Sequence, residues 1–196
     1  TKKDNSQIQV IAKGAINHEV IVNEICDLKP DLLVCYGSSL IRSELLKKFK
    51  NKFLNVHLGL SPYYRGSGTN IWPIINNDLQ MLGATFMFID EGIDTGKIIH
   101  QFREALIKND DPHKIGNRII KKMAKYYCEI IFNFHNLSSE KQPSAKGKLY
   151  YQKDFNADAC LKLYENLTPD KIDNYLAYKK NLQKLPYIVQ NKIIKN

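Results

Sequence analysis

The chain has 196 residues, of which 43% are hydrophobic and 25% charged, and this is the composition and length of a one-domain globular protein. No run approaches the roughly 18 consecutive apolar residues of a membrane span, so we expect no membrane partner. The four cysteines are widely spaced and form no C-x-x-C pair, which argues against a zinc knuckle or a disulfide framework and favours a reduced, cytoplasmic setting.

The formal net charge of +9 is unevenly distributed, because residues 141–196 contain 11 basic and 5 acidic residues. A basic segment of this kind suits a nucleic acid, an anionic membrane or a phosphorylated substrate, and a solvated lysine-rich surface gives the same pattern. The chain contains no RNP motif, zinc finger or arginine-rich block. The charge alone therefore selects no partner.

The first half of the chain alternates predicted strands and helices. Apolar runs predict strands at residues 7–11, 32–36 and 53–57, and the unbroken run LLVCY at 32–36 is typical of a fully buried parallel strand. Helices are predicted at 18–28, with Asn17 as the N-cap, and at 44–50, with Ser43 as the N-cap.

The next segments continue this alternation. Residues 61–69 (SPYYRGSGT) are predicted as a loop because proline and glycine punctuate them, and 70–76 as a short helix. Strands are predicted at 83–89 and 97–102, and a long helix runs to about residue 134, with Asp111 as its N-cap and Pro112 at its first position. The predicted fold is α/β, with an open, mostly parallel sheet flanked by helices.

A polar segment at 138–148 (SSEKQPSAKGK) is the clearest boundary in the chain. We therefore divide the chain into a main α/β domain at 1–137 and a C-terminal appendage at 138–196. Helical patterns occur in the appendage near 157–166 and 169–180, and the last twenty residues are expected to be loosely held.

Polar clusters lie at the carboxyl ends of three of the predicted strands, at 36–39, at Asn55 and His57, and at 90–96. Ligands of open α/β sheets bind beyond the carboxyl ends of the strands. Asn55 and His57 are two residues apart on one strand and so share a face. An amide donor, an imidazole and a carboxylate such as Asp94 are the parts that acyl transfer requires. Each is also an ordinary structural residue, since histidine ends strands and aspartate forms turns.

The order of these residues resembles a known family. The run NVHLGLSPYYRGSGTNIWPIINN, followed by GATFMFIDEGIDTGKIIHQ, resembles the folate-dependent formyltransferases, which include the glycinamide ribonucleotide, methionyl-tRNA and sugar N-formyltransferases. The resemblance covers about residues 32–134, and GKLYYQKDF at 147–155 more loosely. It implies a Rossmann-like fold, with 1–137 as the catalytic domain, and implies that the family's first strand, helix and strand are absent here.

The same resemblance implies a role for each matching residue. Asn55 and His57 match the catalytic pair that polarises the formyl carbonyl and stabilises the tetrahedral intermediate, and Asp94 matches the carboxylate that pairs with this histidine and helps to remove the amine proton. Two walls of the folate pterin pocket correspond to Tyr36, Gly37, Ser38, Ser39, Leu40 and Ile41 and to Ile89, Asp90 and Glu91.

The implied reaction is formyl transfer from 10-formyltetrahydrofolate to a primary amine, and no residue spacing suggests a metal. An amino-sugar nucleotide is the expected acceptor, because YYRGSGTN and GKLYYQKDF resemble the sugar enzymes and the long C-terminal barrel of a methionyl-tRNA enzyme is absent. Tyr64, Arg65 and Gly66 are the candidates that contact this phosphorylated acceptor.

Several alternatives stay open at this point. The chain could be a methionyl-tRNA formyltransferase or a fragment of one, with tRNA as a partner, and glycinamide ribonucleotide is a less favoured acceptor. A folate-binding domain without turnover and an α/β nucleic-acid binder come from other functional classes. The sequence fixes neither the acceptor amine nor the oligomeric state.

Overall fold

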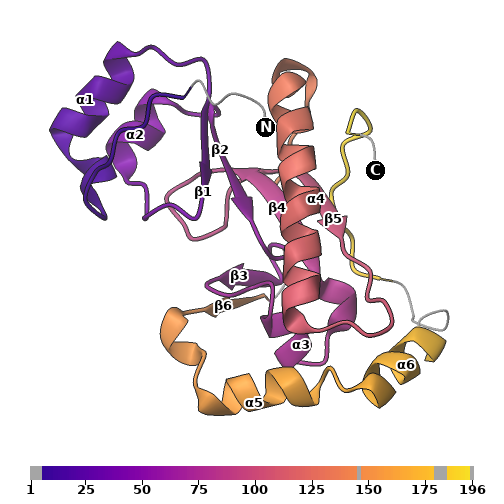
Figure 1. Cartoon of the computed structure of the whole chain (residues 1–196). Helices are drawn as coiled ribbons and strands as arrows, with labels where there is room; N and C mark the ends of the chain where they lie inside the picture. Colours follow the sequence, from indigo (N-terminus) through magenta and orange to yellow (C-terminus); the bar gives the residue numbers. More distant parts are fainter. Residues whose placement is uncertain (1–5, 145–146, 179–184, 195–196) are drawn as a thin grey trace.

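A computed structural model describes residues 6–144, 147–178 and 185–194 (Figure 1). Its main sheet has four strands among these residues, in the order β1 (Leu33–Tyr36), β2 (Phe53–His57), β4 (Gly83–Phe88) and β5 (Ile98–Arg103). Strands β1 and β2 are parallel, and β4 is antiparallel to both β2 and β5. The α/β class is thus confirmed, whereas the sheet is mixed rather than mostly parallel. The loop at 89–97 joins β4 to β5 without a crossover helix.

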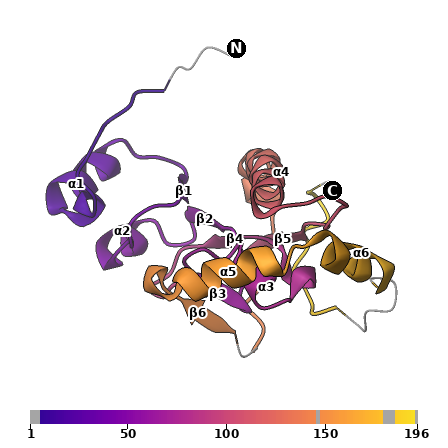
Figure 2. The same cartoon turned by 60° about the horizontal axis from the view of Figure 1, so that its bottom comes forward.

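Helix α4 (Pro112–Phe132) covers one face of the sheet in both views (Figures 1 and 2). It begins as predicted, because the Asp111 carboxylate accepts the backbone N–H of Lys114 at 2.8 Å and Pro112 occupies the first turn. The residues that it buries recur every three or four positions and form one apolar stripe: Ile115, Ile119, Met123, Tyr126 and Ile130.

Helices α1 (Glu19–Asp27) and α2 (Ser43–Lys48) lie beside β1 (Figure 1). Asn17 is not the N-cap of α1. Its side chain instead donates to the carbonyl of Leu40 at 2.8 Å and accepts the N–H of Arg42 at 2.7 Å. Asn17 therefore holds the loop that follows β1 in place and does not cap α1.

Two predictions for the first strands are wrong. Residues 7–11 form no strand, and they are largely exposed. Strand β1 is an edge strand within the described residues, and Val34 and Tyr36 are 47% and 52% exposed. Its apolar run gave the pattern of a fully buried strand, but only one of its edges is paired.

A second, two-stranded sheet lies where β2 ends (Figure 1). Strand β3 (Tyr64–Gly66), within the predicted loop at 61–69, pairs in parallel with β6 (Lys148–Tyr150). Gly66 has φ +93°, and a Cβ there would overlap the carbonyl of Tyr150, so this pairing needs glycine. The remaining elements are α3 (Trp72–Ile75), α5 (Ala157–Glu165), α6 (Pro169–Tyr178) and the 3₁₀ turns Ala15–Asn17, Leu79–Met81, Phe134–Asn136 and Gln152–Asp154.

The described part of the C-terminal segment packs along β5 (Figure 2). The carbonyl of Val189 accepts the N–H of Gln101 at 2.7 Å, and the Asn191 amide donates to the carbonyls of Ile99 and Ser138. Val189 and Asn191 are buried, so the expectation of a loosely held terminus is wrong for these residues, while 179–184 and 195–196 lie outside the described residues. The boundary between 1–137 and 138–196 stays a prediction, and these contacts cross it. Among the residues that the structure describes, no helix combines the length and apolar character needed to cross a membrane.

Candidate active site

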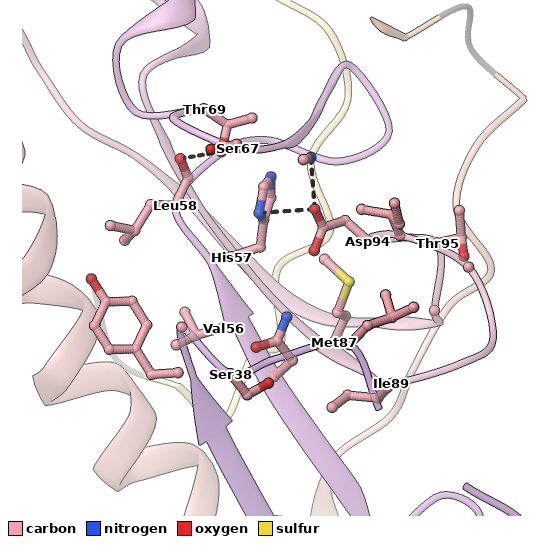
Figure 3. Close-up of a pocket in the computed structure, with 18 of the residues that line it drawn as sticks. Ser38, Val56, His57, Leu58, Ser67, Thr69, Met87, Ile89, Asp94 and Thr95 are labelled. Atoms are coloured by element: carbon pink, nitrogen blue, oxygen red, sulfur yellow. Dashed lines mark hydrogen bonds and ion pairs between the residues drawn. The ribbon is translucent and has the colours of Figure 1, made fainter. Parts of the chain in front are cut away.

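A cavity of about 540 Å³ opens where β1 and β2 end and where the turn after β4 passes (Figure 3). Its walls come from segments far apart in the sequence. It is lined by residues 36–41, 55–58, 66–70, 87–90, 92–96 and 150–152. Asn55, His57 and Asp94, the predicted catalytic residues, all face this space. The topology therefore brings an amide, an imidazole and a carboxylate to one cavity.

Asp94 and His57 form an ion pair at the cavity wall (Figure 3). Oδ2 of Asp94 lies 3.2 Å from Nδ1 of His57 and accepts the backbone N–H of Gly66 at 2.8 Å. Asp94 has φ +54°, in the left-handed region that aspartate tolerates better than most residues. Among the described residues no hydrogen bond reaches its second oxygen, Oδ1, which is left to accept a proton.

Both ring nitrogens of His57 face acceptors. Nε2 lies 2.9 Å from the carbonyl of Tyr64, opposite the contact that Nδ1 makes with Asp94. Either nitrogen can donate to its acceptor, and the tautomer decides which one does. The nearby Gly59 permits this packing, since a Cβ there would lie 2.7 Å from Nε2 of His57. The imidazole thus holds the Asp94 carboxylate through Nδ1 while Nε2 contacts the backbone of Tyr64.

Asn55 presents its amide to the same space. The thiol of Cys35 lies 3.3 Å from Oδ1 of Asn55, and no hydrogen bond to Nδ2 is found among the described residues. The amide nitrogen is therefore a donor available to a bound molecule. A donor beside a carboxylate with a free oxygen is the pair of groups that an amine attacking a carbonyl needs.

The family model described as formyl transferase matches residues 3–131, about two thirds of the chain. The chain belongs to the formyl transferase family. The resemblance seen in the sequence is thereby confirmed.

A curated relative of this chain is the methionyl-tRNA formyltransferase of Finegoldia magna, which is 31% identical over 176 residues. The match covers 83% of this chain and 56% of the relative, so the chain spans about half the length of that protein.

Two solved structures are similar as well. An N-formyltransferase from Helicobacter canadensis, solved with folinic acid and dTDP-3-aminofucose, is 25% identical with a TM-score of 0.55, covering 65% of this chain and 51% of that one. A formyltransferase from Anoxybacillus kamchatkensis, solved with UDP-4,6-dideoxy-4-formamido-L-AltNAc and tetrahydrofolate, is 22% identical with a TM-score of 0.61 and covers 85% of this chain and 86% of that one. Because its sequence identity is only 22%, the Anoxybacillus kamchatkensis structure supports the fold alone.

Both segments predicted as walls of the folate pocket contribute to the lining of the cavity. Residues 36–41 line it, as do Ile89 and Asp90, while Glu91 lies outside the lining. The Asp90 side chain accepts from the N–H of Gly92 and the hydroxyl of Thr95 and so holds the turn that carries Asp94. The backbone N–H groups of Ser38, Ser39 and Ile41 have no hydrogen-bond partner among the described residues.

Of the residues predicted to contact the acceptor, Gly66 lines the cavity, while Tyr64 and Arg65 do not. Tyr64 is buried behind the wall, where its hydroxyl donates to Asp78 at 2.8 Å and burial raises its pKa above the ordinary value. Nε of Arg65 is buried without a hydrogen-bond partner among the described residues.

The sequence analysis missed two segments of the wall, residues 67–70 and 150–152. The backbone N–H of Ser67 donates to the carbonyl of Tyr150 at 2.8 Å and joins the two segments, and the Tyr150 ring stacks on Trp72 with ring centroids 4.3 Å apart. The loose resemblance of GKLYYQKDF was the signal that could have identified residues 150–152. Within the described residues, no group of three or more His, Cys, Asp or Glu side chains is arranged to hold a metal ion.

Proposed function

We propose that this protein transfers a formyl group from 10-formyltetrahydrofolate to the amino group of an amino-sugar nucleotide. The observation that carries the proposal is the convergence of Asn55, His57 and Asp94 on one cavity, with the Asn55 amide nitrogen and one Asp94 oxygen unpaired among the described residues. Membership of the formyl transferase family supports the reaction class.

The cavity fits the folate ring system. A pterin is flat, has apolar faces and carries donors and acceptors along its edge. The buried side chains of Ile41 and Met87 supply apolar surface, and the unpaired N–H groups of Ser38, Ser39 and Ile41 supply edge donors. The folinic acid named in the Helicobacter canadensis structure supports the same choice of donor.

Bound 10-formyltetrahydrofolate would supply a formyl carbonyl that an amine can attack. Asn55 would donate from Nδ2 to the formyl oxygen, where negative charge develops as the amine attacks. A fixed hydrogen-bond donor of this kind stabilises that charge more strongly than a mobile water molecule would. Because His57 directs both ring nitrogens to protein acceptors, Asn55 is the side chain free to make this contact.

Asp94 would take the proton that the amine loses, and a proton would pass to N10 of the folate as the bond between N10 and the formyl carbon breaks and tetrahydrofolate leaves. The amine must arrive neutral, since an ammonium group has no lone pair, and its proton leaves as the new bond to carbon forms. Oδ1 of Asp94 faces no other donor among the described residues, while Oδ2 is held by His57 and Gly66. In this arrangement His57 keeps the carboxylate in place through the contact between Nδ1 and Oδ2.

The acceptor would enter beside residues 66–70 and 150–152, opposite the folate walls. Their hydroxyl and amide groups suit a sugar, and the net charge of +9 suits the phosphates of a sugar nucleotide. The dTDP-3-aminofucose named in the Helicobacter canadensis structure supports this class. We also propose the cytoplasmic setting that the sequence predicts. The cysteines support it, because all four are free thiols in the structure.

Methionyl-tRNA is the second candidate acceptor, because the Finegoldia magna relative that covers most of this chain is a methionyl-tRNA formyltransferase. The basic excess of residues 141–196 would suit the tRNA backbone. This candidate predicts binding that weakens steeply with salt concentration. An amino-sugar nucleotide makes far fewer phosphate contacts and predicts a shallow dependence.

The test begins with calorimetric titration of the full chain with 5-formyltetrahydrofolate, a stable analogue of the donor. Turnover is then measured with 10-formyltetrahydrofolate and either a panel of dTDP- and UDP-amino sugars or methionyl-tRNA, with Asn55→Ala as the inactive control. We expect saturable analogue binding in both proteins, and turnover of an amino sugar by the wild type alone.

Each other outcome has a defined meaning. Turnover of methionyl-tRNA in place of the sugars would replace the first acceptor by the second. Analogue binding without any turnover would indicate a folate-binding domain. A folded protein that does not bind the analogue would overturn the proposed function.

A further inference from the structure

Cys35 lies directly behind the catalytic amide. It sits on β1 opposite Asn55 of β2, as its Cα partner in the parallel register. Asn55 lines the cavity, whereas Cys35 does not. The thiol therefore touches the Asn55 side chain without reaching the space that a substrate would occupy.

The contact between the two side chains is directional. Sγ of Cys35 donates to Oδ1 of Asn55 at 3.3 Å, which directs the amide oxygen toward β1 and leaves Nδ2 for the cavity. A thiolate would do the opposite, because it accepts a hydrogen bond and would attract Nδ2. Burial and the charge of Asp94 raise the pKa of the Cys35 thiol, while a hydrogen bond from Ser38 lowers it, and burial dominates. The thiol thus remains a donor at neutral pH.

A tyrosine of α4 fixes the backbone around this pair. The hydroxyl of Tyr127 accepts the N–H of Cys35 at 3.2 Å and lies 3.0 Å and 3.1 Å from the carbonyls of Cys35 and Leu54. Leu54 directly precedes Asn55, so one hydroxyl bridges both strands where the two side chains meet. The separation between Cys35 and Asn55 is therefore set by the sheet and by α4 together.

From these contacts we propose that Cys35 is a positioning residue, whose thiol fixes the orientation of the Asn55 amide so that Nδ2 faces the cavity. The proposal rests on the proposed function for its effect on turnover, but its effect on the Asn55 amide can be measured without turnover. A group held by a fixed neighbour reacts faster than one that must first be oriented.

The test compares Cys35→Ala, which removes the donor, with Cys35→Ser, which keeps a donor. Cys26→Ala, a partly buried cysteine on α1 that does not line the cavity, is the matched control. In a ¹⁵N-labelled sample, the side-chain NH₂ signals of Asn55 are assigned by their loss in Asn55→Asp. The steady-state kcat and KM for donor and acceptor and the thermal midpoint are measured for all variants.

We expect the Asn55 NH₂ signals to shift and broaden in Cys35→Ala and to stay near their wild-type positions in Cys35→Ser and Cys26→Ala. We expect kcat to fall about tenfold in Cys35→Ala with KM unchanged, and to recover to within about threefold of the wild type in Cys35→Ser. A merely structural role would lower the thermal midpoint without this rescue.

Unchanged NH₂ signals in Cys35→Ala would overturn the proposal, as would a Cys35→Ser variant whose signals and kcat match those of Cys35→Ala. If the wild type shows no turnover with any acceptor, the proposed function fails, and the NH₂ signals still decide whether Cys35 orients Asn55.

Discussion

Nδ1 of His57 lies 3.2 Å from Oδ2 of Asp94, and the same carboxylate oxygen accepts the N–H of Gly66. One carboxylate thus joins the end of β2, the end of β3 and the turn after β4. Both side chains are largely buried, at 6% and 12% exposure, so water competes little for the contact between them. The same contact thus shapes the cavity wall and places the carboxylate that we propose as the proton acceptor.

Replacing the Asp94 carboxylate by an amide separates its structural contact with Gly66 from its negative charge and its capacity to accept a proton. Asp94→Asn keeps an oxygen that can accept from Gly66, but it removes the negative charge beside His57 and the group that takes the amine proton. We expect kcat to fall at least about 100-fold, with little change in 5-formyltetrahydrofolate affinity, in steady-state assays and calorimetry. Asp173→Asn, which breaks only an exposed ion pair with Lys108, is the control and should retain full activity. Near-wild-type turnover in Asp94→Asn would exclude Asp94 as the proton acceptor.

The Asn55 amide is tested by two variants that differ in shape. Asn55→Ala removes the side chain, and Asn55→Asp keeps its shape but has no N–H to donate. If donation from Nδ2 stabilises the developing charge, kcat should fall about 100- to 1000-fold in both variants. The affinity for 5-formyltetrahydrofolate should stay close to that of the wild type. Activity retained in Asn55→Asp would mean that the shape of the side chain, rather than its hydrogen-bond donor, is what the reaction needs.

The sequence predicted the elements whose signals are local. Strand β2 was found at its predicted residues, because an apolar run bounded by turn residues defines it, and α4 begins at its predicted cap and proline. The pairing of Asn55 with His57 on one face follows from the two-residue period of a strand. These features depend on residues within a few positions of one another.

The remaining features depend on contacts across the chain. The three residues of β3 lie in a glycine-rich segment and become a strand only by pairing with residues 148–150. Whether β1 is buried or at an edge depends on its neighbours, and its composition is the same in both cases. The left-handed turn that carries Asp94 is held locally by Asp90 and Thr95, whereas the contact of its carboxylate with Gly66 comes from across the chain.

His100 makes the stability of the fold depend on pH. It is buried, its Nδ1 accepts the N–H of Asn191 at 3.1 Å, and burial lowers its pKa to about 4, against the opposing effect of Glu129 and with a smaller contribution from Lys122. The unfolded chain binds this proton below about pH 6.5, whereas the native state binds it only near pH 4. Stability is therefore lost as the pH falls through this window.

The variant His100→Gln cannot titrate, but its amide oxygen can still accept from Asn191. Between pH 7 and pH 5 the free energy of unfolding should fall about 2 kcal/mol more in the wild type than in His100→Gln, measured by urea denaturation. His113→Gln, at an exposed position in the first turn of α4, should keep the wild-type pH dependence. Equal slopes for the wild type and His100→Gln would contradict this assignment.

Arg118 of α4 neutralises a buried carboxylate. Its guanidinium binds Asp110 through two hydrogen bonds of 2.6 Å and 2.8 Å and lies 3.3 Å from Glu104, and the Asp110 side chain is only 1% exposed. The hydrogen bonds with Asp110 raise the pKa of Arg118 above its ordinary value. Removing one partner of such a pair leaves the other charge buried without compensation.

Arg118→Leu should therefore lower the free energy of unfolding by about 3 kcal/mol in urea denaturation at pH 7. Arg118→Lys keeps the charge but cannot form the two parallel hydrogen bonds, so its loss should be smaller. Lys125→Ala, which breaks an exposed pair with Glu129 on the same helix, is the control and should cost less than about 0.5 kcal/mol. If Arg118→Leu were as stable as Lys125→Ala, the hydrogen bond from the N–H of Ile107 to Asp110 would be sufficient to hold the buried carboxylate without the guanidinium.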